Sequence, residues 1–183
     1  MSKKRYIRVI LSVAAAIAAA ACTQQLQTTY DSQDKKIDSF ISSQLSSGAI
    51  LRVYVNEGSN RLVIAEGEGE DSLAVNGTVT FNYAAYTFTG SLNRNNLFAT
   101  NHAETAEADG WGSVTELDTA PCTWNLANDR MVPGLRNGLF GVKAGQECYI
   151  VFNGKYGFGS SPMGNVPANS ALLYHIWVTD IRN

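Results

Sequence analysis

The spacing of apolar residues divides the chain into an apolar start, a polar stretch and a long β-rich remainder. Residues 9–21 form a charge-free apolar run, and residues 23–47 are rich in Gln, Ser, Thr and Asp. Within that polar stretch, four apolar residues recur at helical spacing: Ile37, Phe40, Ile41 and Leu45. We therefore predict a short amphipathic helix over residues 34–45. The residues before it have the composition of a flexible tether.

From residue 50 onward the pattern changes to short runs rich in β-branched and aromatic residues. Clusters of Asn, Gly, Ser and Glu separate these runs, as turns separate strands. We predict strands over 50–55, 61–65, 78–88, 122–126, 147–152 and 171–181, and a further strand that opens at Leu97. Residues 132–140 form the helix-like segment of the second half. Strands around one short helix predict an α+β fold, with an antiparallel sheet packed on a helix.

The segment 100–121 interrupts the strand pattern. It is acidic, rich in Ala and Thr, and contains Gly110-Trp111-Gly112. Two interpretations stay open, a long surface loop or an excursion with its own short helix near residues 103–108. Long loops in compact domains are uncommon and often functional.

The first 22 residues have the layout of an export signal. Four basic residues precede the apolar run: Lys3, Lys4, Arg5 and Arg8. The run is too short to span a bilayer comfortably and ends at Ala19-Ala20-Ala21 before Cys22. An uncleaved membrane anchor is the alternative. The same junction resembles a bacterial lipobox, with Ala19 where Leu is usual. We predict a signal peptide over residues 1–21, a lipid on Cys22 and a tether over residues 22–48.

Removal of residues 1–21 would leave 10 Lys and Arg against 16 Asp and Glu, a formal charge of −6. A nucleic-acid binder carries a basic face, so we expect no nucleic-acid partner. The expected compartment, the cell envelope outside the cytoplasm, is oxidising. There Cys122 and Cys148 could form a disulfide worth about 3 kcal/mol. Two separate buried thiols are the alternative.

Motifs of the second half occur in a fixed order. Residues 77–83 read Gly-Thr-Val-Thr-Phe-Asn-Tyr, and residues 132–146 place a Val before a Gly that opens a short helix and end in Ala-Gly-Gln. Residues 155–159, Lys-Tyr-Gly-Phe-Gly, and 166–172, Val-Pro-Ala-Asn-Ser-Ala-Leu, follow. Together they resemble the FKBP-type peptidyl-prolyl cis-trans isomerases, here in the form of a bacterial lipoprotein. The resemblance covers Ile50 to Asn183 and implies an FKBP-like domain over residues 49–183.

The resemblance implies that the chain isomerises X–Pro bonds in proline-containing polypeptides, with exported proteins as substrates. The barrier, about 20 kcal/mol, comes from resonance in the amide. A dry apolar pocket that fits the twisted amide lowers this barrier without a nucleophile. We therefore expect no cofactor, no metal and no catalytic dyad, and a membrane contact through the lipid alone.

The resemblance also implies a set of pocket residues: Tyr83, Phe98, Val132, Leu135, Phe158, Val166 and Tyr174. Each can equally be a packing residue, because such a pocket is an exposed edge of the core. The chain departs from the family pattern at four positions. Leu135 replaces an indole floor, Ala99 an Asp, Phe158 a Tyr, and Cys122 an aromatic wall residue.

Two of these departures, at Ala99 and Phe158, remove hydrogen-bonding groups, each worth roughly 0.5–1.5 kcal/mol. They predict a weaker or differently specific isomerase. The alternative is a non-catalytic binding or chaperone-like module, or a scaffold, of an envelope lipoprotein.

Other candidate sites are weaker. His102 and His175 are the only histidines, and His175 is interpreted as a surface residue. The acidic loop 66–71 lacks the spacing of an EF-hand. The Gly-rich stretch 154–164 lacks the Lys and the following helix of a phosphate loop.

Overall fold

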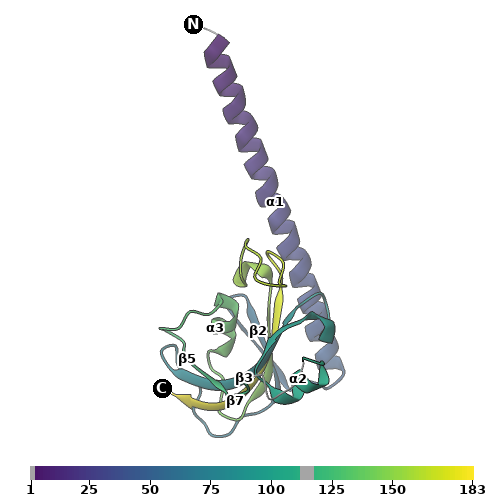
Figure 1. Ribbon diagram of the computed structural model, residues 1–183, viewed down its shortest axis with the longest axis vertical. Coiled ribbons are helices and arrows are strands. Elements are labelled where there is room, and N and C mark those ends of the chain that lie inside the picture. The colour runs from purple at the N-terminus through teal and green to yellow at the C-terminus, as the bar shows by residue number, and fades with distance from the viewer. Residues whose placement is uncertain (1–2, 112–117) are drawn as a thin grey trace. The chain divides into compact units, whose positions relative to one another are not determined.

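The computed structural model describes residues 3–111 and 118–183 (Figure 1). The chain forms two compact units, residues 1–32 and 33–183. Helix α1 (Lys3–Ser46) begins in the first unit and ends in the second. The predicted helix 34–45 is thus confirmed. In the described part of the chain, no helix combines the length and apolar character needed to cross a membrane.

Residues 23–33, expected to be a flexible tether, are helical instead. Their polar side chains form hydrogen bonds within the helix. The Thr28 and Thr29 hydroxyls donate to carbonyls four residues earlier, and the Gln27 amide donates to Asp31 at 2.7 Å. The Gln27–Asp31 side-chain pair stabilises the helix by a few tenths of a kcal/mol, whereas the two hydroxyl bonds satisfy the Thr side chains without adding stability. Composition alone does not reveal these hydrogen bonds.

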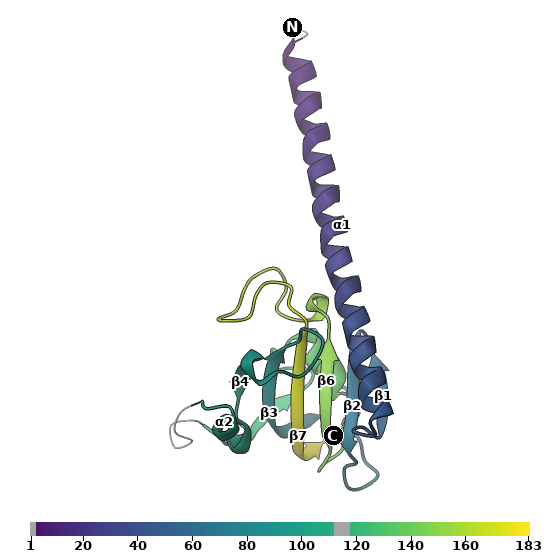
Figure 2. The same cartoon turned by 90° about the vertical axis from the view of Figure 1, so that its right-hand side faces the viewer.

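The second unit is built on one seven-stranded antiparallel sheet (Figures 1 and 2). Its strands are β1 (Arg52–Asn56), β2 (Ser59–Ala65), β3 (Thr78–Thr87), β4 (Leu97–Thr100), β5 (Cys122–Asn125), β6 (Glu147–Phe152) and β7 (Leu172–Arg182). The order is β1-β2-β6-β7-β3-β4, and β5 also pairs with β3. Each predicted strand is present, so the α+β prediction is confirmed.

The described residues of the unit also contain four short helices: η1 (Arg94–Asn96), α2 (Ala103–Ala108), α3 (Pro133–Leu139) and η3 (Gly154–Tyr156). Helix α3 packs against one face of the sheet, where the larger core lies. The end of α1 covers the other face, where Ile37 and Phe40 join a second core with Leu173 (Figure 2). The alternation along β7 divides its side chains between these two cores.

Two glycines allow α3 to lie close to the sheet. A Cβ atom on Gly134 would lie 2.2 Å from the ring of Phe152, and one on Gly138 would lie 2.2 Å from Ile150. From β2, the buried guanidinium of Arg61 donates to the carbonyls of Gly138 and Phe140 at the end of the helix. A cation there also interacts favourably with the helix dipole. Burial lowers the pKa of Arg61.

The described beginning of the segment 100–121 lies against the same sheet face as the end of α1. The predicted short helix 103–108 is confirmed as α2. His102, just before it, stacks on Trp177 of β7 with ring centroids 3.8 Å apart. Asn101 accepts from the Tyr83 amide and donates to the Ala120 carbonyl. Residues 112–117 of this segment lie outside the described residues.

The disulfide between Cys122 and Cys148 is absent, since both are free thiols. Cys122 lies on β5 and Cys148 on β6, with β3 and β7 between them. Three strand spacings of about 4.8 Å separate the two residues, and a disulfide needs Cα atoms within about 7 Å. The alternative of two separate thiols is therefore confirmed. Burial raises the pKa of each to about 12.

The interpretation of His175 as a surface residue is wrong, because its side chain is only 16% exposed. It points away from α3, against the rings of Tyr149 and Trp177. Burial lowers its pKa to about 4, although a 2.7 Å hydrogen bond to Glu147 acts in the opposite direction. His175 is therefore held neutral inside the fold at pH 7.

Acidification is expected to destabilise the domain through His175. In unfolded chains the pKa of histidine is about 6.5, so below that pH the unfolded state binds more protons. The stability present above pH 6.5 is lost as the pH falls toward 4, by roughly 2 kcal/mol at pH 5. Denaturant unfolding at pH 7 and pH 5 checks this. His175→Gln should lose less stability than the unmodified chain between the two pH values. An equal loss in both would contradict the assignment.

Candidate functional site

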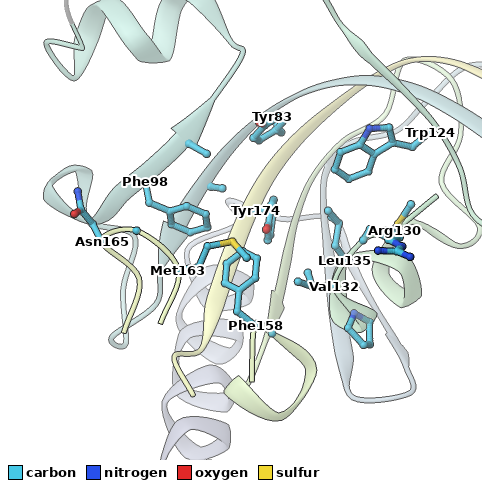
Figure 3. Close-up of a pocket in the computed structure, with 16 residues that line it drawn as sticks. Tyr83, Phe98, Trp124, Arg130, Val132, Leu135, Phe158, Met163, Asn165 and Tyr174 are labelled. Carbon is cyan, nitrogen blue, oxygen red and sulfur yellow. The ribbon is translucent and has the colours of Figure 1, made fainter. Parts of the chain in front are cut away.

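A pocket of about 800 Å³ opens beside α3 (Figure 3). Its described lining comes from six parts of the chain: β3, β4, β5, the segment 130–135 that leads into α3, the loop between β6 and β7, and β7, whose Tyr174 lies at the centre. Such a concave, mainly apolar cavity is the usual form of a small-ligand or peptide-side-chain site.

Aromatic rings form the wall of the pocket. Phe98 of β4 packs against Phe158 and Tyr174, with centroids 6.0 and 6.3 Å away, in edge-to-face geometry. Tyr83 of β3 lies 6.4 Å from Tyr174. Trp124 of β5 also lines the pocket and meets Phe81 edge-to-face at 5.5 Å. Edge-to-face pairs of this kind add stability beyond area burial, so the wall is firmly supported.

The floor comes from the start of α3. Val132 is its N-cap residue, Pro133 occupies its first turn, and Leu135 is almost completely buried. A proline there fixes the backbone angle φ that a helix needs. Because Gly134 lets α3 lie close to Phe152, Leu135 is held at the base of the aromatic wall.

The loop between β6 and β7 closes one side of the pocket with Phe158, Met163 and Asn165. Gln33 of α1 forms hydrogen bonds to both ends of this loop. The side-chain oxygen of Gln33 accepts from the Gly154 amide, and its nitrogen donates to the Asn169 carbonyl, each at 2.8 Å. Between these two attachments, the amides of Met163 and Val166 bond to each other's carbonyls at 3.0 and 2.9 Å. The loop is therefore fastened at its base and at its tip.

Few polar groups reach the pocket. Burial raises the pKa of Tyr83 and of Tyr174. The neighbouring Cys122 raises the pKa of Tyr83 further, and Tyr83 in turn raises the pKa of Tyr174. Both hydroxyls are thus neutral donors at pH 7. Within residues 23–111 and 118–183, neither hydroxyl has a hydrogen-bond partner. They are available to a bound molecule.

Six of the seven residues predicted to form the pocket line it together: Tyr83, Phe98, Val132, Leu135, Phe158 and Tyr174. The seventh, Val166, is 1% exposed and belongs to the core beside the pocket. Its backbone pairing with Met163 turns the chain so that Met163, not Val166, faces the cavity. The departures Ala99 and Phe158 do line the pocket. The catalytic roles of the seven predicted residues stay predictions.

The aromatic wall position predicted at Cys122 belongs to Trp124. Cys122 does not line the pocket, and its thiol donates to the Phe81 carbonyl. The two residues lie on the same side of β5, because side chains alternate along a strand. Other lining residues, among them Arg130, Met131 and Met163, were not predicted either. Among the lining residues that were missed, only Trp124 had a sequence signal, which is a Trp in a short predicted strand.

The described residues of the insertion, 100–111 and 118–121, leave the pocket open. No described residue of the segment 100–121 lines it, because α2 and His102 lie on the opposite face of the sheet. The cavity therefore remains accessible to an extended peptide from the side of Met163 and Arg130, both of which are exposed.

Comparisons with known proteins show related sequences and the same fold. FK506-binding protein 1 of Aspergillus oryzae is 23% identical over 125 residues, 68% of this chain and 99% of that protein. Peptidyl-prolyl cis-trans isomerase FKBP9 of Homo sapiens is 36% identical over 53 residues, 29% of this chain but only 9% of that protein. The N-terminal domain of FKBP42 from Arabidopsis thaliana has a TM-score of 0.54 at 20% identity, over 73% of this chain and 94% of that chain, and shows the fold.

A model of the family described as FKBP-type peptidyl-prolyl cis-trans isomerase matches residues 70–179. This range includes β3 to β7, α3 and the pocket-lining residues between them. With its sheet, its short helix and its apolar pocket, the chain belongs to the FKBP-type peptidyl-prolyl cis-trans isomerase family.

Proposed function

We propose that this chain isomerises X–Pro peptide bonds at the pocket beside α3. The observation that supports this most is that the pocket is open, apolar and lined by four aromatic side chains besides Phe158, although two polar groups expected from the family are absent. A pocket filled by the insertion would instead have favoured a module that binds without catalysis.

The chemistry follows from the lining. A proline ring seated on Leu135 between Phe98 and Trp124 leaves water behind. The planar amide is more charge-separated than the twisted one, so a dry environment favours the twisted form. Because the site offers shape and low polarity in place of a reacting group, the rate gain comes from tighter binding of the transition state.

Tyr174 supplies the hydrogen bond that Phe158 cannot. Both rings pack against Phe98, and the Tyr174 hydroxyl lies in the middle of the pocket without a partner in the described chain (Figure 3). Its proton can be donated to a carbonyl that flanks the twisted amide. One hydrogen bond contributes roughly 0.5–1.5 kcal/mol, so activity is retained but reduced or altered in specificity.

We further propose that the protein acts outside the cytoplasm, on exported proteins, as a lipid-anchored protein. The apolar run 9–21 followed by Cys22 is the sequence feature behind this proposal. Each methylene of an acyl chain buried in a membrane contributes about 0.8 kcal/mol, so several chains anchor a protein durably.

The alternative, a binding module without catalysis, draws on Ala99 and Phe158, which leave the pocket with fewer hydrogen-bonding groups than the family pattern implies. It requires that a proline peptide binds but is not turned over.

Replacing Tyr174 by Phe is expected to lower kcat/KM for a proline peptide about two- to tenfold, because it removes one hydrogen bond and no packing. The measurement is the rate of peptide isomerisation with the full chain and each variant. Tyr149→Phe, which removes a hydroxyl on the opposite sheet face, is the matched control and should leave the rate unchanged. If the unmodified chain fails to accelerate several proline peptides, the proposed activity is excluded.

If Cys22 carries a lipid, the full chain and the Cys22→Ser variant should differ in labelling and in solubility. Expressed in bacteria with labelled palmitate, the full chain should carry the label and partition into detergent, whereas Cys22→Ser should do neither. Cys122→Ser keeps Cys22 and should behave like the unmodified chain. An unlabelled, water-soluble unmodified chain would show that Cys22 carries no lipid.

A further inference from the structure

Among the described residues that line the pocket, one carries a formal charge, and that charge is positive. Arg130 lies where the chain passes from β5 to α3, and every other lining residue is apolar or neutral (Figure 3). No described acidic residue lines the cavity to compensate for the guanidinium. A bound peptide would therefore meet an uncompensated positive charge at the rim.

The guanidinium of Arg130 is available to a ligand. It is exposed, and no carboxylate of the described residues forms an ion pair with it. The neighbouring acid, Asp129, is already engaged. Its carboxylate accepts from the Asn125 amide at 2.6 Å, and its carbonyl accepts from Arg136 at 2.9 Å. These bonds fix the turn that presents Arg130, and its guanidinium has no ion-pair partner among the described residues.

A guanidinium at the rim of a dry pocket favours a carboxylate as its neighbour in a bound peptide. Its planar set of donors matches a carboxylate with two parallel hydrogen bonds. A bound peptide would exclude water around the pair, which strengthens the attraction relative to bulk water. A cationic side chain at the same place would be repelled.

We propose that Arg130 makes this site selective for prolines flanked by Asp or Glu. The proposal rests on the proposed isomerase function and names the substrate class of the same pocket. Since Arg130 is exposed, the effect is modest. From the strength of exposed and partly desolvated ion pairs, we expect kcat/KM to differ about three- to tenfold between a Glu and a Lys peptide at low salt.

The test uses the full chain and peptides that carry Glu, Gln or Lys immediately before or immediately after one proline. In the unmodified chain, Glu should exceed Gln and Gln should exceed Lys at one of the two positions, and the differences should shrink in 0.5 M salt because ions screen an exposed pair. Arg130→Gln should remove the order, and Arg130→Glu should reverse it. Arg182→Gln, which removes an equal charge outside the pocket, should preserve it.

Two failures can be told apart. Equal rates for the three peptides at both positions, with clear isomerisation of all, would overturn the role of Arg130 and leave the isomerase function intact. If no peptide is isomerised, the proposed function fails, and the dissociation constants of the same peptides decide the role of Arg130. A preference for Glu that is lost in Arg130→Gln supports the selectivity, and equal affinities overturn it.

Discussion

The close contact between α3 and the sheet fixes the position of the pocket floor, and the rest of the site depends on it. Gly134 and Gly138 bring the helix so near to Phe152 and Ile150 that any side chain there would overlap them. Overpacking of such a contact costs about 1–3 kcal/mol. Because the helix cannot move outward without losing the carbonyl contacts of Arg61, its first turn is fixed at the base of the aromatic wall. The pocket is the space left between that turn and the loop after β6.

The pocket keeps the physical basis of proline isomerisation while its polar groups are rearranged. The apolar floor and the aromatic wall remain, which is what desolvation of the amide requires. A hydroxyl is absent at Phe158 and present at Tyr174, two rings that pack against Phe98. The loop that carries Phe158 is fastened at both ends by Gln33. A preorganised wall of this kind loses little entropy when a peptide binds.

The strands and α3 could be predicted from sequence, because the alternation of apolar residues and the positions of Gly and Pro are local signals, and α2 was one of two alternatives that the sequence left open. The wall residue of β5 could not be predicted. An insertion of 22 residues precedes it, and a shift of two residues between Cys122 and Trp124 leaves the same strand face inward. Val166 was assigned to the pocket through the family resemblance, and its backbone pairing with Met163 has no sequence signature. Arg130 was missed because a charge in a turn has no pattern.

The central claim is that this pocket catalyses and does not only bind. Two-dimensional exchange NMR on a proline peptide with a small fraction of the full chain separates the two cases, because exchange peaks between cis and trans signals report turnover. The account predicts exchange peaks that persist with Phe140→Ala, which removes an exposed ring outside the pocket, and that vanish with Phe98→Ala. Peptide signals that shift or broaden without cis–trans exchange peaks would contradict it.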